Sequence, residues 1–333
     1  MLTTTNGILW QTLEGPLAGL ELARLGWGTT EALTAGLPHD DIAGLWLVNP
    51  VTGGLPPVAQ RFHLPATHGT PVLYNGKNVG THYEDDYAEY VLLMGITAED
   101  LTAGRVAQSD ATFEAIEGAL KSIGFDFHNV VRTWFYLDGL LEWYDDFNRS
   151  RDRFFESRGI FGGFVPASTG IGCANLNGAA IIAGAIAMRP KQDAAGKPLA
   201  HAEMVESPLQ CSALDYRSSF SRAAEIVTPE GQYLFISGTA SIEPQGATVH
   251  LDDGAKQIGL TMDVVEAILG ARQMTFKDIT RAVAYIKRPE DRCHWQAWLA
   301  AHNLPADYAQ EVIADVCRDD LLFELEADAV KLS

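Results

Sequence analysis

The chain has 333 residues, of which 47% are hydrophobic and 20% are charged, and its formal net charge is −19. Nucleic acids and anionic membranes are bound through basic surfaces, so this acidic balance excludes both as expected partners. A small anionic metabolite is still compatible, because a few arginines can bind it at contact distance. The length suits two domains at the usual ~100 to 200 residues each.

Four cysteines are scattered along the chain without a CxxC pair, which predicts reduced thiols in a cytosol. They are Cys173, Cys211, Cys293 and Cys317. The first residues lack the basic and apolar regions of a secretory signal, and no apolar run approaches the length of a membrane span. We therefore expect a soluble, cytoplasmic protein.

Residues 1–70 combine Gly, Pro and Thr with short apolar runs such as 45–48, a pattern typical of short strands and loops. His63 and His68 lie in this region, but no neighbouring residues complete a metal site. We expect structural or surface roles for both histidines. Neither a metal ion nor a cofactor is expected in the protein.

A helical pattern begins near residue 110, where apolar residues recur at three- and four-residue spacing. The apolar run 130–137 predicts a strand, and 140–155 predicts a second helix with an aromatic face. Such aromatic residues can stack on bases, but their helical spacing and the negative charge of the chain favour core packing. After a loop, 166–172 leads into small apolar residues.

The same order of elements recurs in the second half of the chain. A shift of 149 residues without a gap lays 111–137 on 260–286. A repeat of this length fits two copies of one α+β domain, and the polar segment 189–198 fits a linker between them. We assign 1–190 to an N-terminal domain with an extension, and 206–333 to a C-terminal domain.

The stretch 321–327 alternates with period two: Leu321, Phe323 and Leu325 share one face, while Leu322, Glu324 and Glu326 lie on the other. This pattern predicts a strand. The run 312–317 also has strand character, and a turn between the two predicts an antiparallel hairpin that brings Cys317 close to Glu324. A glutamate among apolar neighbours lies either at a hydrated edge or in a pocket.

Taken in order, pieces of the second copy resemble the signatures of the RidA/YjgF superfamily. These pieces are 235–238, Gln257 at a helix start, 278–286 and 323–327. The resemblance covers most of residues 85–330. It implies a chorismate-mutase-like fold for each copy, in which two helices cover one face of a mixed β-sheet, and it identifies the N-terminal copy as degenerate. It also implies a homotrimer with sites at the domain interfaces.

Longer segments are similar to the chorismatase branch of this superfamily, whose members cleave the enolpyruvyl ether of chorismate and release pyruvate. The segments are 166–172, 219–223, 236–242 and 314–322. By position, Glu324 matches the catalytic glutamate of that branch. Cys317 matches a cysteine of the subgroup that makes a hydroxybenzoate. The resemblance thus places the candidate site in the C-terminal domain.

Two segments differ from the patterns of these relatives. Chorismatases carry a longer segment with Tyr-Gly-Pro-Arg before Ser-x-Phe-Ser-Arg-Ala, where this chain has only 215–218, so Arg217 is a partial substitute. Simpler RidA deaminases hold a substrate carboxylate with the arginine of a Pro-Ala-Arg motif. Ser168 stands at that place in the first copy, and 305–308 of the second copy has no arginine. We therefore do not expect enamine deamination by the usual route.

Cleavage of an enol ether needs a proton, which a carboxylic acid with a raised pKa can supply near neutrality. Desolvation on an apolar strand would raise the pKa of Glu324 in this way. The alternative is a glutamate paired with an arginine at a subunit contact. Cys317 is either a nucleophile in the same pocket or a small, buried apolar side chain.

A substrate with two carboxylates needs arginines, whose guanidinium groups bind carboxylates through paired hydrogen bonds. Arg217 and Arg222 are the candidates, with Tyr216 beside them as a further substrate contact. Arg281 is buried by pattern, and its repeat partner is also an arginine, which indicates a shared structural role. Gly238 either lets a ligand approach the backbone or forms a turn at positive φ.

Together these features predict a cofactor-independent enzyme of the chorismatase type, a hydrolase or lyase that acts on chorismate or a related anionic metabolite. One alternative is a hydrolase or deaminase that acts on another enol- or imine-containing metabolite. A second alternative is a RidA-like protein that binds a metabolite without catalysis.

Overall fold

The computed structural model describes residues 9–12, 42–47, 58–63, 70–175, 178–211 and 219–333. The first copy of the repeat forms a six-stranded sheet. In spatial order its strands are β4 (Thr70–Tyr74), β5 (Lys77–Glu84), β6 (Ala88–Ile96), β9 (Ile181–Pro190), β7 (Val130–Leu137) and β8 (Ala167–Gly172). The predicted strand 130–137 is β7.

The second copy forms another six-stranded sheet with corresponding strands in the same order. They are β10 (His201–Val205), β11 (Ala223–Thr228), β12 (Gly231–Ala240), β15 (Phe323–Leu332), β13 (Ile279–Ile286) and β14 (Gln310–Ile313). In each sheet the last pair, β7 with β8 or β13 with β14, is parallel, and the other pairs are antiparallel. A helix makes the crossover that each parallel pair requires.

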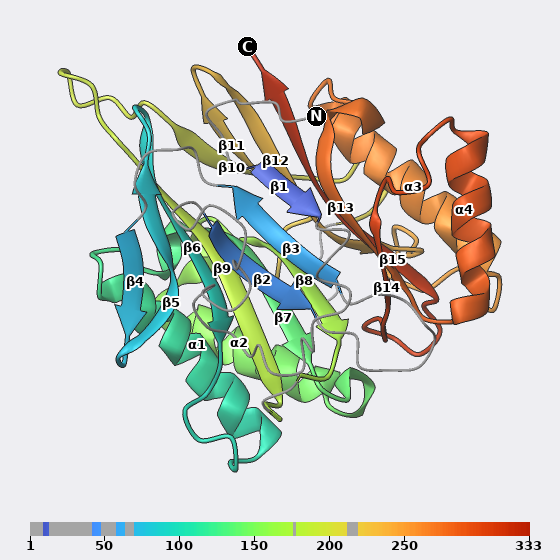
Figure 1. The fold of residues 1–333 in the computed structure, drawn as a ribbon, viewed down its shortest axis with the longest axis horizontal. Helices are drawn as coiled ribbons and strands as arrows, with labels where there is room; N and C mark the ends of the chain where they lie inside the picture. The colour runs from blue at the N-terminus through green and yellow to red at the C-terminus, as the bar shows by residue number, and fades with distance from the viewer. Residues whose placement is uncertain (1–8, 13–41, 48–57, 64–69, 176–177, 212–218) are drawn as a thin grey trace, which may run out of the picture.

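Four α-helices cover the two sheets (Figure 1). They are α1 (Arg105–Lys121), α2 (Tyr144–Arg158), α3 (Gly254–Ala271) and α4 (Arg292–Ala301). The α1–α2 pair packs on the first sheet and the α3–α4 pair on the second, each around its own apolar core. The predicted α+β fold, with two helices on one face of each mixed sheet, is confirmed. Across the described residues, no helix is long and apolar enough to span a membrane.

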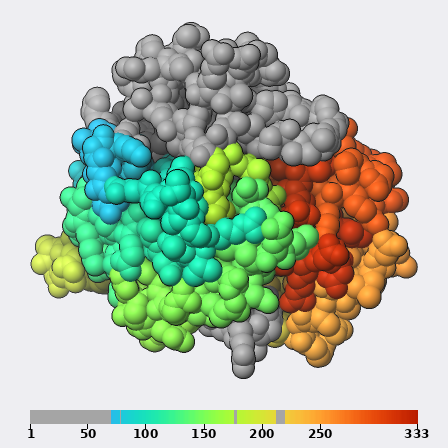
Figure 2. Space-filling model, turned by 90° about the horizontal axis from the view of Figure 1, so that it is seen from below, coloured from blue at the N-terminus to red at the C-terminus, as the bar shows by residue number. Residues whose placement is uncertain are grey.

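The faces of the two sheets that carry no helix pack against each other. Trp134 and Tyr136 of β7 meet Phe235 of β12 and Tyr285 of β13 in this inner core. Both faces of β7 are therefore covered, which explains why all of its residues are buried and why its sequence does not alternate. The space-filling view shows the first copy directly beside the second (Figure 2).

A third, three-stranded sheet precedes the two copies. Its order is β1 (Leu9–Thr12), β3 (Val58–His63) and β2 (Ile42–Leu47), and both pairs are antiparallel. β1 lies near β13, β2 near β6 and β3 near β14. The expected strand character of 45–48 agrees with β2 as far as Leu47, and Val48 lies outside the described residues. His63 is the last residue of β3, whereas His68 lies outside the described residues.

The predicted hairpin between 312–317 and 321–327 is wrong. β14 pairs in parallel with β13, and β15 pairs with β12 and β13, so β13 lies between the two proposed partners. The crossover through α4 places β14 at the sheet edge beyond β13. Residues 314–322 form an irregular connection instead. The period-two pattern itself is confirmed, because Phe323 and Leu325 face the α3–α4 core.

Candidate active site

A cavity of about 500 Å³ lies between the two copies of the repeat. The first copy contributes α2 and β8 to its wall, and the second contributes β12, β15, the 314–322 connection and the segment before β11. Four of the six predicted site residues line it: Glu324, Cys317, Arg222 and Gly238. The other two, Tyr216 and Arg217, lie outside the described residues.

Glu324 is the second residue of β15 and only 4% of its surface is exposed. Its side chain turns away from the α3–α4 core because Phe323 and Leu325 occupy that face. The pKa of the carboxyl is raised to about 8, chiefly by burial and secondly by the nearby Glu326, while Arg132 and Arg222 act in the opposite direction. The carboxyl is therefore predominantly protonated at neutral pH, inside a pocket rather than at a hydrated edge.

Gly238 provides the room that the Glu324 carboxyl occupies. A Cβ atom added at Gly238 would collide with Oε1 of Glu324. The backbone of Gly238 is not in the positive-φ region, so the interpretation as a turn glycine is wrong. Pairing of β12 with β15 shifts here, between Ile236 and Thr239, and the Gly238 N–H donates to Thr169 Oγ1 at 3.1 Å. The glycine is required by space and not by its backbone angle.

Arginines dominate the charged part of the cavity wall. Arg149 and Arg151 come from α2, Arg222 precedes β11, and Arg318 lies in the 314–322 connection. These four guanidinium groups share the wall with the carboxyl groups of Asp145, Asp152 and the neutral Glu324. The cavity thus has the charge and size to accept a small anion.

Two of these arginines hold fixed positions around Phe220. Arg222 is buried, its Nε donates to the Cys211 carbonyl oxygen at 3.0 Å, and its guanidinium carbon lies 5.7 Å from the centre of the Phe220 ring. Arg151, also buried, lies 5.8 Å from the same ring and donates to Asn148 Oδ1 at 2.8 Å. Arg222, predicted as a carboxylate anchor, therefore lies on the wall with its side chain already oriented.

Cys317 lies on the same wall, next to the small apolar cluster that includes Val316 and Leu321. The pKa of its thiol is raised to about 12, chiefly by burial and secondly by the Glu324 carboxyl. A thiol rather than a thiolate is a weak nucleophile. The structure thus favours the interpretation of Cys317 as an apolar part of the wall.

Behind Glu324, a set of four buried charges joins the two sheets. Arg132 Nη2 donates to Glu326 Oε2 at 2.7 Å, and Arg281 pairs with Glu326 and, at 3.2 Å, with Asp328. Arg281 thus has the structural role that its pattern predicted, and its repeat partner Arg132 shares that role. All four side chains are buried at the contact between the sheets.

Sequence reasoning did not select several cavity residues, among them Arg318, Arg151 and Tyr144. Arg318 directly follows Cys317, so the resemblance that drew attention to Cys317 contained the signal for it. The other two lie in the helix that was assigned to core packing. That assignment is right for Phe147, which is fully buried, but α2 turns Arg151 and Tyr144 toward the cavity.

Comparison with known proteins gives consistent results. Residues 211–331 match the family model described as Endoribonuclease L-PSP. A chorismatase of Streptomyces hygroscopicus is 28% identical over 248 residues, which cover 67% of this chain and 68% of the relative. A 3-hydroxybenzoate synthase of the same organism is 27% identical over 260 residues, covering 67% of this chain and 72% of the relative.

A solved structure extends the comparison to the whole fold. The crystal structure of a chorismatase superposes with a TM-score of 0.68 at 20% sequence identity, covering 98% of this chain and 100% of that one. At this identity the match shows a shared fold. It includes the arrangement of two α+β domains in one chain, as the repeat in the sequence predicted.

Proposed function

This chain is a tandem RidA-like protein that resembles chorismatases, and from this premise we propose that it is an enzyme that cleaves the enolpyruvyl ether of chorismate or of a closely related anion. The observation that carries the proposal is the Glu324 carboxyl, buried and neutral, facing a cavity whose wall holds four arginines. A neutral acid beside anion-binding groups suits protonation of a negatively charged enol ether.

In the proposed reaction, Glu324 gives its proton to the methylene carbon of the enolpyruvyl group. The resulting oxocarbenium ion adds water, which loses a proton to the Glu324 carboxylate, and the hemiketal collapses to pyruvate and a ring alcohol. One water is consumed for each ether cleaved. Elimination across the ring would instead release pyruvate and a hydroxybenzoate without net consumption of water. Both routes begin with an acid that must be protonated.

Arg222 and Arg318 are proposed to bind the carboxylates of the substrate, because both lie on the cavity wall near Glu324. Arg318 is oriented by a hydrogen bond from its Nη1 to the Gly246 carbonyl oxygen at 2.8 Å. Arg217 and Tyr216 remain predicted contacts. A homotrimer also remains a prediction, which light scattering of the purified protein would test by its mass.

The proposal is tested by incubating the protein with chorismate and measuring pyruvate, with Glu324→Gln in parallel. We expect release by the wild type and a loss of roughly 100-fold or more in the variant, the usual contribution of a general acid. Glu225→Gln is a matched control, since Glu225 is a buried carboxyl on β11 that pairs with Arg272 away from the cavity. It should retain turnover.

Other outcomes would select another function. Absence of pyruvate from the wild type would exclude chorismate and direct the search to other enol-containing anions. Equal turnover in Glu324→Gln would exclude Glu324 as the acid. Binding of chorismate without turnover would support the non-catalytic alternative. The mass of the ring product would distinguish hydrolysis from elimination. Hydrolysis of chorismate leaves a ring with two hydroxyl groups, which is heavier than a hydroxybenzoate by one water.

A further inference from the structure

Three acidic side chains of β15 point toward the contact between the two sheets. Glu324, Glu326 and Asp328 alternate with Leu325 and Ala327, which belong to the α3–α4 core. All three acids are at most 4% exposed. Three adjacent buried carboxyl groups on one face of a strand cannot all be ionised without compensating cations.

Hydrogen-bond donors converge on the middle carboxylate. Glu326 Oε2 accepts from Arg132 Nη2 at 2.7 Å and from Trp134 Nε1 at 3.0 Å, and Oε1 accepts from Arg281. The hydroxyl of Thr169 is a further donor to it. The two arginines and these donors lower the pKa of Glu326 despite its complete burial. Glu326 is thus a fixed anion whose orientation is set by both copies of the repeat.

No comparable set of donors reaches Glu324: among the described residues, no hydrogen bond to its carboxyl is present. The two buried arginines of the set are already matched by the carboxylates of Glu326 and Asp328. Ionisation of Glu324 would therefore add a negative charge that this buried set does not match, two residues from an existing one. The charge balance of the buried set is satisfied when Glu324 is neutral.

We propose that Glu326 is a positioning residue for the reaction, an anion that holds the neighbouring Glu324 carboxyl in its protonated form. This inference rests on the proposed function, since the acid it acts through is the one assigned there. Like charges within a few ångströms raise the pKa of the less stabilised group, typically by about one unit or more. The pKa of Glu324 is raised by burial and then by Glu326, in agreement with this arrangement.

Other ionisable groups also face Glu324 and are part of the balance. Arg132 of β7 and Arg222 before β11 favour its ionised form. The Cys317 thiol is uncharged. Tyr285 of β13, which is paired with Glu324, is also neutral because burial raises its pKa well above the usual value. Arg318 lies on the same wall, and Arg149 and Arg151 line the cavity from α2. With these cations present, loss of the Glu326 anion should shift Glu324 toward ionisation.

The test compares Glu326→Gln, Asp328→Asn and the control Glu225→Gln with the wild type. Two readouts are used: the alkaline limb of kcat/KM against pH, and infrared titration of the buried carboxylic acid band that disappears in Glu324→Gln. In the wild type we expect a midpoint near the pKa of about 8. In Glu326→Gln it should fall by about one pH unit or more, and in Asp328→Asn by less.

Each result has a defined meaning. Asp328→Asn leaves the buried Arg132–Glu326 pair in place. This variant therefore provides the measurement if Glu326→Gln does not fold. An unchanged midpoint in the folded charge variants, or an equal shift in Glu225→Gln, would overturn the inference. Infrared shifts in the expected order together with no turnover of chorismate by the wild type would refute the proposed function and leave the role of Glu326 intact.

Discussion

The two copies of the repeat share one scaffold but differ in the strand at the centre of each sheet. In the second sheet, Tyr285 of β13 is paired with Glu324 of β15, whereas in the first sheet the equivalent Tyr136 is paired with Ile182 of β9. The next two acids differ in the same way. Glu326 and Asp328 correspond to Gly184 and Ile186. The first copy therefore has no carboxyl group at any of the three positions.

The difference shows a division of roles between two similar domains. The first copy supplies Arg132, Trp134 and Thr169 to the Glu326 carboxylate of the second, and it supplies α2 to the cavity wall. The first copy therefore contributes a cation to this buried set but no carboxyl group. The second copy thus provides Glu324, the acid of the proposed reaction, and the first copy provides much of the environment that sets its charge state.

The largest effect is expected from the glycines that occupy equivalent places in the two copies. Gly238→Ala should lower kcat/KM by about 100-fold, because the added Cβ would displace the Glu324 carboxyl by the order of an ångström. Gly95, the equivalent residue of β6, has a φ of 69°. Gly95→Ala should instead cost about 1 kcal/mol of stability and leave turnover nearly unchanged.

Steady-state kinetics and thermal unfolding of both variants separate these effects. If Gly238→Ala loses stability but keeps full turnover, the space beside Glu324 has no catalytic importance. If Gly95→Ala loses turnover to the same extent, the two copies do not differ as proposed.

The next effect concerns stability and its dependence on pH. The carboxyl of Glu324 ionises in the unfolded chain above pH ~4.5, but in the folded chain only near its pKa of about 8. The contribution of this group to stability is thus fully present at low pH and is lost as pH rises between these values. Glu324→Gln places an uncharged side chain at this position, as Ile182 does in the first copy. The variant should therefore not lose stability through this group as pH rises.

The free energy of unfolding of Glu324→Gln, relative to the wild type, should therefore increase from pH 5 to pH 8 by about 2 to 4 kcal/mol. Urea titrations at several pH values measure it. A constant difference between the two proteins across this range would show that the folded protein accommodates the Glu324 carboxylate as readily as the acid.

Much of this organisation follows from the sequence. Periodicity located β7 and the helices α1 and α2, and the repeat predicted two equivalent domains. Such signals are local or arise from internal similarity. The alternation in 321–327 also placed Glu324 on the correct face of its strand, because a strand residue between two core residues must point to the other side.

The failures concern contacts between segments far apart in the chain. The hairpin was wrong because pairing of 312–317 with 321–327 looked local, whereas the crossover through α4 places β13 between them. Arg132 donates a hydrogen bond to Glu326 across 194 residues of sequence. No local sequence pattern predicts this contact. The space beside Gly238 likewise depends on where the Glu324 side chain lies, which backbone preferences alone do not predict.

A smaller difference between the copies is expected from two equivalent buried glutamines. Gln257 donates to the Asp320 carbonyl oxygen at 2.9 Å and accepts from the Leu322 N–H at 2.8 Å. Gln108 binds the Ala103 carbonyl oxygen and the Ala180 N–H in the same manner. Substitution of either by Leu should cost about 2 kcal/mol, since several buried hydrogen bonds are lost.

The connection held by Gln257 contains the cavity residues Cys317 and Arg318, whereas none of the described residues beside Gln108 lines the cavity. Gln257→Leu should therefore also lower kcat/KM roughly 10-fold, a typical consequence of small displacements at a site, while Gln108→Leu keeps it. Chemical denaturation and pyruvate release provide both quantities. Equal losses of turnover in the two variants would indicate a general effect of reduced stability.

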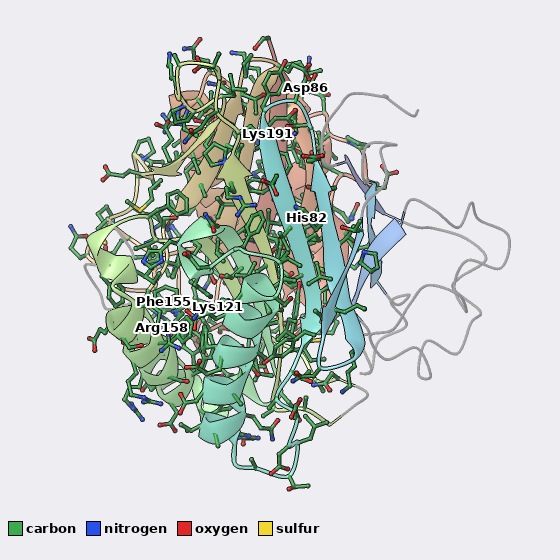
Figure 3. All side chains as sticks on the ribbon, turned by 90° about the vertical axis from the view of Figure 1, so that its left-hand side faces the viewer. His82, Asp86, Lys121, Phe155, Arg158 and Lys191 are labelled. Carbon is green, nitrogen blue, oxygen red and sulfur yellow. The ribbon has the colours of Figure 1, made fainter. Side chains whose placement is uncertain are left out.

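The smallest effect is expected on the outer surface of the helices, where the copies differ in how the two helices are joined. Arg158 of α2 reaches Glu114 and Glu117 of α1, and its guanidinium carbon lies 4.4 Å from the centre of the Phe154 ring. Figure 3 labels Arg158 on α2 and Lys121 on α1, both of which pair with Glu117. Within the described residues, no ion pair joins α3 to α4.

Arg158→Ala should cost about 1 kcal/mol, because partly exposed ion pairs contribute little and the guanidinium also packs on an aromatic ring. Arg292→Ala, which removes the pair of a half-exposed arginine with Glu311 in the second copy and no packing on an aromatic ring, should cost less. High salt should reduce the difference between Arg158→Ala and the wild type only in part, since packing on Phe154 is not screened. If high salt abolished the stability difference between Arg158→Ala and the wild type, the contribution of Arg158 would be due to charge alone.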